Sequence, residues 1–297
     1  MRQNITTMTF REKLNEPLNI DAAKIAAAKQ SILTVEQYRE TPFANNERQR
    51  VYVFTLEKGD KQITYFGTAH INNPEDPLFD DIQSAFQEAT PDMVYVEGWA
   101  SINTRKDLIR EVLQDTALET SKKEGENFFV VKLAVDAGID FESPEPSLSD
   151  EIVHLLNKGF SKKDIFYFYA YRDIMQYQRE NKNKTAEDCE KYLQGCFADF
   201  RRDSEWDAAE CAGFETEILA ELEVENTDKY YDQVDPIPWE EKSQTVLNRI
   251  SQESSEFRDA YIVERIAEGT KHHNKIFVVY GSAHAVKQEP ALRVLLS

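Results

Sequence analysis

Apolar residues follow two patterns along the chain, one typical of strands and one typical of helices. Segments with these two patterns alternate, which predicts an α/β fold. Short runs of β-branched and aromatic residues are typical of strands, and they span residues 51–57, 61–66, 92–97, 139–142 and 275–280. Apolar positions spaced three and four residues apart predict helices, which lie at 21–33, 77–89, 104–120, 124–137, 243–268 and from 289 onward. We therefore expect a mixed central sheet with helices packed on it.

A long segment in the middle of the chain lacks strand patterns. From Ser147 to about Glu223 the sequence is almost wholly helical. It includes a strongly aromatic helix whose start, at Ser161, has the spacing of a capping box. The aromatic side chains of this helix are predicted to form a core or a dimer interface, and they are Phe166, Tyr167, Phe168, Tyr169, Tyr171 and Tyr177. Residues 230–239 contain two prolines, which predict a break after the segment.

These patterns predict one domain with an insertion, built from four parts. Residues 1–50 form an N-terminal arm that packs on the core, and residues 51–145 form a first α/β half. Residues 146–240 form an acidic, aromatic-rich helical insertion. Residues 241–297 form a second α/β half that completes the domain. A chain of 297 residues, 41% of them hydrophobic, can bury one large core or two smaller ones.

A four-residue phrase occurs twice and indicates that the two halves are related. The first copy is GTAH at Gly67–His70, and the second is GSAH at Gly281–His284. Each copy closes an apolar, strand-like run, and its glycine permits a sharp turn at the strand end. We therefore predict two ββα-type halves, each with a strand that ends in a GxxH motif.

Three side chains with acid–base or metal-binding chemistry are predicted at strand ends. His70 and His284 follow two apolar runs, and Glu97 follows a third, MVYV. Because the ends of neighbouring strands share an edge of a sheet, the three could face one site. Two imidazoles and a carboxylate can ligate a divalent metal and leave positions open for water. Without metal, the same set can perform general acid–base hydrolysis.

Acyl and phosphoryl chemistry also needs a group that stabilises the charge developing on oxygen. Arg172 and Arg258 each precede an aspartate in a helical pattern. We favour Arg258, because it lies on the helix that leads into the final strand. Glu142 ends the short run IDF in the same way as Glu97 ends MVYV, and its role is left open between a loop acid and a carboxylate beside the site.

Charge and length exclude several classes of function. The formal net charge of −19 disfavours nucleic acid and anionic membrane surfaces as partners. Between residues 201 and 240 there are 13 acidic and 3 basic residues, which indicates either a solvated face or a docking surface for a basic partner. The N-terminus shows no secretion-signal pattern, no apolar run is long enough to span a membrane, and the three cysteines form no paired motif. We expect a cytoplasmic protein with reduced thiols.

The motifs GTAH, VYVEG, FRDAYI and FVVYGSAH, in this order, resemble the TraB/PrgY/GumN family. This family includes the TIKI proteases and lies near the erythromycin-esterase-like proteins. The resemblance is specific over residues 63–98 and 257–296. It implies an α/β fold of repeated halves and a single cleft lined by His70, Glu97, Arg258 and His284. TIKI-like members are divalent-metal-dependent proteases, and the esterase-like relatives hydrolyse esters with a similar His and Glu constellation.

The sequence therefore predicts a hydrolase that acts on a peptide or a small-molecule ester. His70, Glu97 and His284 would hold a divalent metal such as Mn, Co or Zn, or serve as bases, and Arg258 would steady an oxyanion or carboxylate. One alternative is a regulatory protein that binds a small ligand or peptide in the same pocket without turnover. Another is a homo-oligomerisation module built on the aromatic helix.

Overall fold

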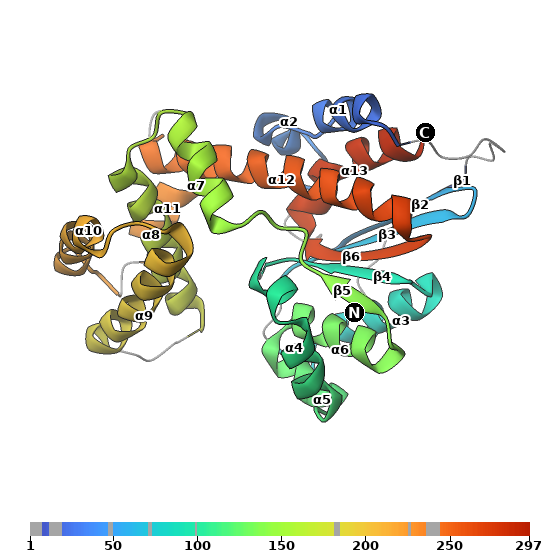
Figure 1. The fold of residues 1–297 in the computed structure, drawn as a ribbon, viewed down its shortest axis with the longest axis horizontal. Coiled ribbons are helices and arrows are strands. Elements are labelled where there is room, and N and C mark those ends of the chain that lie inside the picture. The colour runs from blue at the N-terminus through green and yellow to red at the C-terminus, as the bar shows by residue number, and fades with distance from the viewer. Residues whose placement is uncertain are drawn as a thin grey trace. The chain divides into compact units, whose positions relative to one another are not determined.

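The computed structural model describes residues 8–11, 20–46, 50–70, 73–98, 100–180, 185–224, 227–235 and 244–297. The chain divides into two compact units (Figure 1): Met1–Glu145 together with Asp259–Ser297, and Pro146–Arg258. The first division falls where the sequence predicts the end of the first α/β half. The second falls after Arg258 rather than at residue 240, because the start of the long helix α12 packs Leu247 and Ile250 into the core of the second unit.

The first unit contains a six-stranded mixed sheet in the order β1-β2-β3-β6-β4-β5. β2 and β3 form an antiparallel hairpin around Gly59, whose φ of 61° suits a residue without a side chain. From β3 through β6 and β4 to β5 the strands run parallel. The strand bounds are β1 Met8–Arg11, β2 Tyr52–Lys58, β3 Lys61–Thr68, β4 Met93–Val96, β5 Asp140–Glu142 and β6 Lys275–Gly281. The predicted α/β class with a mixed sheet is confirmed. β1 also adds a strand within the predicted N-terminal arm.

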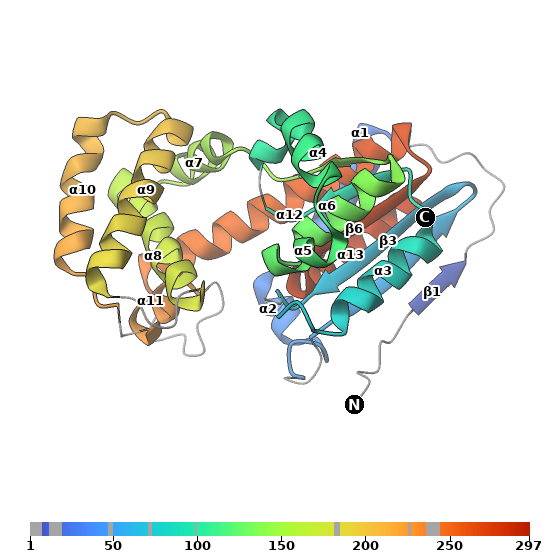
Figure 2. The same cartoon turned by 90° about the horizontal axis from the view of Figure 1, so that it is seen from below.

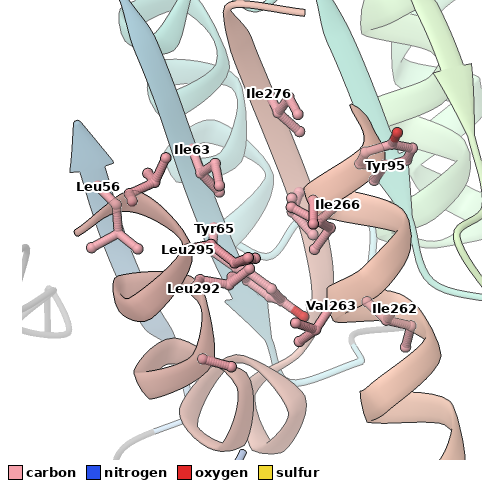
Figure 3. Close-up of a cluster of buried hydrophobic side chains, with 14 of the residues drawn as sticks. Leu56, Ile63, Tyr65, Tyr95, Ile262, Val263, Ile266, Ile276, Leu292 and Leu295 are labelled. Carbon is pink, nitrogen blue, oxygen red and sulfur yellow. The ribbon is translucent and has the colours of Figure 1, made fainter. Parts of the chain in front are cut away.

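Helices cover both faces of this sheet, which explains why its parallel strands are apolar almost throughout. One face packs against α1 (Ala22–Gln30), α12 (Val246–His272) and α13 (Ser282–Leu296). Figure 3 shows Ile63, Tyr65 and Ile276 of the sheet meeting side chains of α12 and α13. The opposite face packs against helices that lie in front of the sheet in Figure 2, namely α3 (Leu78–Ala89) and α6 (Glu126–Ala137), together with α4 (Lys106–Gln114).

Short elements complete the first unit. They are α2 (Val35–Arg39), the 3₁₀ turn η1 (Ala100–Thr104), α5 (Leu118–Ser121) and the 3₁₀ turn η2 (Lys122–Glu124). No helix in the described ranges combines the length and the apolar character that a membrane crossing requires.

The second unit is helical and has its own aromatic core. It contains α7 (Leu148–Asn157), α8 (Lys162–Glu180), α9 (Ala186–Ser204), α10 (Ala208–Ala220), α11 (Thr227–Val234) and the start of α12. Phe166 and Phe168 of the aromatic helix α8 are each 1% exposed. Their rings pack within this unit, Phe166 against Phe197 and Phe200. These two side chains form part of the core of the second unit, which is one of the two roles predicted for them, while homo-oligomerisation stays a prediction.

Two predicted details differ in the structure. Residues 230–234 were predicted as part of a break but belong to α11, while residues 236–240 lie outside the described ranges. The second half does not have a ββα order: a 27-residue helix, α12, precedes one strand, β6, and α13 follows directly. In the sequence, α12 precedes β6 where a ββα half would have its first strand. Only the first half therefore contains a hairpin.

Candidate active site

The two GxxH motifs meet at one edge of the sheet because β3 and β6 are parallel neighbours. In their register Thr68 lies opposite Gly281, so both strands deliver their histidines to the same end. Glu97 follows β4, the neighbour of β6 on its other side, and its backbone N–H donates to the Val279 carbonyl at 3.0 Å. Side chains that are far apart in the sequence thus come together around the end of β6.

The carboxylate of Glu97 lies between the two imidazoles. His70 Nε2 is 3.5 Å from Glu97 Oε2, and His284 Nε2 is 3.8 Å from Oε1. The Gly281 N–H donates to Oε2 at 2.5 Å. A Cβ atom at Gly281 would stand 2.8 Å from His70 Nε2 and 3.2 Å from Glu97 Oε2. This position needs glycine because any side chain would displace the cluster.

His70 is held from behind by a buried carboxylate. It adopts a left-handed backbone conformation with φ of 53°, which only a few per cent of non-glycine residues show. Its Nδ1 lies 3.0 Å from Oε1 of Glu126, the first residue of α6, and Thr68 Oγ1 donates to the same oxygen at 2.9 Å. Burial alone would raise the pKa of Glu126, but the hydrogen bond and charge of His70 lower it below its usual value.

His284 has an equivalent partner from another helix. It lies in the first turn of α13, and its Nδ1 is 2.6 Å from Oδ1 of Asp259 on α12. Asp259 is 1% exposed, pairs with the buried Lys287, and accepts a hydrogen bond from Gln288 at 2.7 Å. Burial would raise the pKa of Asp259, but the charges of Lys287 and His284 hold it well below its usual range.

The two carboxylates give both histidines the same orientation. A carboxylate at Nδ1 keeps a proton on that nitrogen and fixes the orientation of the ring, so each imidazole turns its Nε2 the other way. Each Nε2 faces Glu97, as the distances above show. The side chain of His70 is 52% exposed, whereas that of His284 is 14% exposed. Water and substrate can therefore reach His70 more easily.

Sequence reasoning missed both orienting carboxylates. Asp259 lies within FRDAYI, directly after Arg258, the predicted oxyanion-binding residue. The position of Asp259 on an otherwise apolar face of the helix predicts that it is buried, and a buried carboxylate needs partners. This pattern could have identified it from the sequence. Glu126 opens a helix after Gly125, where an acid is ordinary. No signal in the sequence links Glu126 to His70.

The structure shows partners for two of the other candidates and leaves the role of the third as a prediction. Glu142 lies on the edge strand β5 and pairs with Lys106 at 2.9 Å and Arg265 at 3.3 Å, so it has a structural role there. Arg172 lies over the ring of Phe168 in the second unit. Arg258 is the last residue of the second unit, and its role in anion binding stays a prediction.

The donor types suit a divalent metal, but the present arrangement is not an assembled metal centre. Two imidazole nitrogens and a carboxylate, with carboxylates behind both imidazoles, are typical of such sites. Yet within the described part of the chain no group of three or more His, Cys, Asp and Glu side chains is placed so that it could hold a metal ion. Metal binding by His70, Glu97 and His284 stays a prediction.

Comparison with known proteins adds no identification. No protein-family model, curated protein or solved structure matches this chain. The resemblance of its motifs to the TraB/PrgY/GumN family therefore stays a prediction as well.

Proposed function

We propose that this protein is a hydrolase that activates water at the cluster of His70, Glu97 and His284 against a peptide or ester carbonyl. One observation carries the proposal: two imidazoles, each backed by a buried carboxylate, turn their Nε2 atoms to the two oxygens of one glutamate. A core histidine needs one partner to satisfy it. Two such pairs converging on a third carboxylate at a sheet edge are what acid–base catalysis requires.

The different exposures of the two histidines support different roles for them in this proposal. The more exposed His70 takes a proton from the attacking water at Nε2, and Glu126 stabilises the imidazolium that forms. The less exposed His284 begins the cycle as an imidazolium, with Asp259 as its counter-ion, and donates its Nε2 proton to the leaving group. Proton exchange with water then returns His70 to the neutral form and His284 to the imidazolium. Glu97 lies between them and orients both rings. Glu126 and Asp259 are positioning residues, because they act through the imidazoles.

The sequence motifs support the same class of reaction. GTAH, VYVEG, FRDAYI and GSAH supply His70, Glu97, Arg258 and His284 in the order expected for TraB-like and erythromycin-esterase-like hydrolases. In this proposal Arg258 binds a carboxylate or oxyanion of the substrate. The steps above use only side chains of this protein, water and the substrate.

A substrate panel with matched variants tests the proposal. Purified protein is assayed against p-nitrophenyl esters of increasing acyl length and against a mixed peptide library, before and after chelation. We expect His70→Ala and His284→Ala to abolish hydrolysis, while His272→Ala, which removes an exposed histidine, leaves it unchanged. Elemental analysis of protein purified without chelator decides whether a metal takes part.

Two outcomes would contradict the proposal. If the wild-type protein hydrolyses nothing in the panel but binds peptides or small molecules saturably, the protein is a binding or regulatory protein instead. If hydrolysis survives in the variants lacking His70 or His284, the activity belongs to another site.

A further inference from the structure

A cavity of about 360 Å³ opens in the first unit, between η1, α4 and α6. Its size falls in the range of small-molecule sites, about 300–1,000 Å³. Six of the seven side chains that line it are apolar, and the seventh is a guanidinium; they are Ile102, Leu108, Ile109, Val112, Leu113, Phe128 and Arg105. The cavity shares none of these residues with the histidine cluster.

Helix α4 turns an apolar stripe toward this cavity and leaves part of that stripe exposed. Positions 105, 108, 109, 112 and 113 follow the spacing of one helix face, and all five line the cavity. Leu108 is 57% exposed and Val112 is 58% exposed. In the described part of the chain only four large apolar side chains are exposed to this degree, and two of them are here. Such a concentration of apolar surface indicates a binding site.

The charge at the rim of the cavity has no counter-ion among the residues that the structure describes. Next along the helix, Lys106 pairs with Glu142 at 2.9 Å, and Arg110 pairs with Asp140 at 2.6 Å. Arg105 has no ion pair with any described residue, although it is the residue that lines the cavity. It also stands at the N-cap of α4, where the helix dipole favours a negative charge. A bound anion would satisfy both the guanidinium and the helix end.

We infer that the cavity binds a medium-chain carboxylate, with its carboxylate on the Arg105 guanidinium and its alkyl chain along the stripe of α4. A planar guanidinium can hold a carboxylate through two parallel hydrogen bonds. From Arg105 to Val112 the helix rises by about 10 Å, close to the length of an extended chain of about ten carbons. This site goes beyond the proposed hydrolysis and does not depend on it.

Calorimetric titration compares three ten-carbon probes: decanoate, decan-1-ol and decylammonium, all below their micellar concentrations. We expect one decanoate per chain, weaker binding of the alcohol, and the weakest binding of the cation. Arg105→Gln should weaken decanoate about tenfold or more, as expected for the loss of the charge-assisted hydrogen bonds of the guanidinium, and leave the alcohol unchanged. Val112→Asn should weaken decanoate and the alcohol together.

Two surface variants serve as controls. Lys123→Gln removes an exposed charge from the same unit, and Val153→Asn alters an apolar side chain that is 55% exposed in the second unit. Both should bind like the wild type. The inference is overturned if decanoate does not saturate, if decylammonium binds as tightly, or if Arg105→Gln behaves like Lys123→Gln. It is also overturned if sedimentation shows a dimer that Val112→Asn dissociates, because the apolar stripe of α4 would then be an interface with a second copy of the chain.

Discussion

The buried carboxylate of Asp259 orients His284 and also neutralises Lys287, so its removal should be costly. Asp259 is 1% exposed and Lys287 is 5% exposed. Asparagine keeps the shape of the side chain but removes its charge, which takes the carboxylate of Asp259 away from the buried ammonium of Lys287. Breaking a buried pair in this way costs about 3–5 kcal/mol. We expect Asp259→Asn to lower the free energy of unfolding by about 3 kcal/mol, because Gln288 still supplies a polar neighbour.

A double-mutant cycle separates charge from packing. Adding Lys287→Met to Asp259→Asn removes the buried ammonium charge of Lys287. The double variant should therefore regain a large part of the stability that Asp259→Asn loses. Urea unfolding followed by circular dichroism gives the free energies. Hydrogen exchange at β6 and α13 assigns the affected transition to the first unit.

Asp107→Asn provides the matched control, since it makes the same substitution at an exposed position of α4. It should change stability by less than about 0.5 kcal/mol. The reasoning is refuted if Asp259→Asn costs no more than this control, or if adding Lys287→Met makes the protein less stable still.

Three further predictions concern the glycine of the first motif, the stability of the protein at low pH, and the aromatic core of the second unit. Gly67→Ala should destabilise the first unit by about 1–3 kcal/mol in urea unfolding, because its Cβ would stand 2.8 Å from the Tyr52 carbonyl oxygen; an unchanged midpoint would contradict this. The pKa values of Glu126 and Asp259 are lowered by folding, so their contribution is present above the unfolded values near pH 4 and is lost as pH falls below them; acid titration of both alanine variants should show a smaller loss than the wild type. Phe168→Ala should cost about 3–5 kcal/mol in the second unit without changing the sedimentation coefficient of the native protein, and a shift to smaller species would support the interface hypothesis.

The strands and most helices could be predicted because their signals are local. Alternating and continuous apolar runs identified β2, β3, β4 and β6 within a residue or two, since buried parallel strands are apolar on both faces. The hairpin at Gly59 follows from turn chemistry alone. The common edge of the two GxxH motifs also followed, because parallel neighbours end together.

The helical conformation of the second motif, GSAH, could not be predicted from local sequence signals. GSAH resembles GTAH, yet His284 lies in a helix that begins at Ser282 and continues through Pro290, whereas His70 lies beyond the end of its strand. A proline ordinarily marks a first helical turn, so the sequence predicted the helix from residue 289. Packing of Ala285 and Leu292 into the core outweighs the lost backbone hydrogen bond.

The orienting carboxylates depend on tertiary packing rather than on local pattern. Glu126 reaches His70 across 56 positions, and Asp259 reaches His284 across 25. The sequence at the start of α6 does not show which strand end Glu126 will approach, and the sequence pattern of α12 does not show this for Asp259. The sequence could therefore predict the histidines and Glu97 but not the groups that fix the orientation of the imidazoles.

The rate of hydrolysis in a Glu97→Gln variant tests the central claim most directly. Glutamine keeps the size and the hydrogen bond from Gly281 but removes the charge between the imidazoles. On the best substrate of the panel, kcat/KM should fall by about a hundredfold or more, while His272→Ala matches the wild type. Equal rates for Glu97→Gln and wild type would contradict the account.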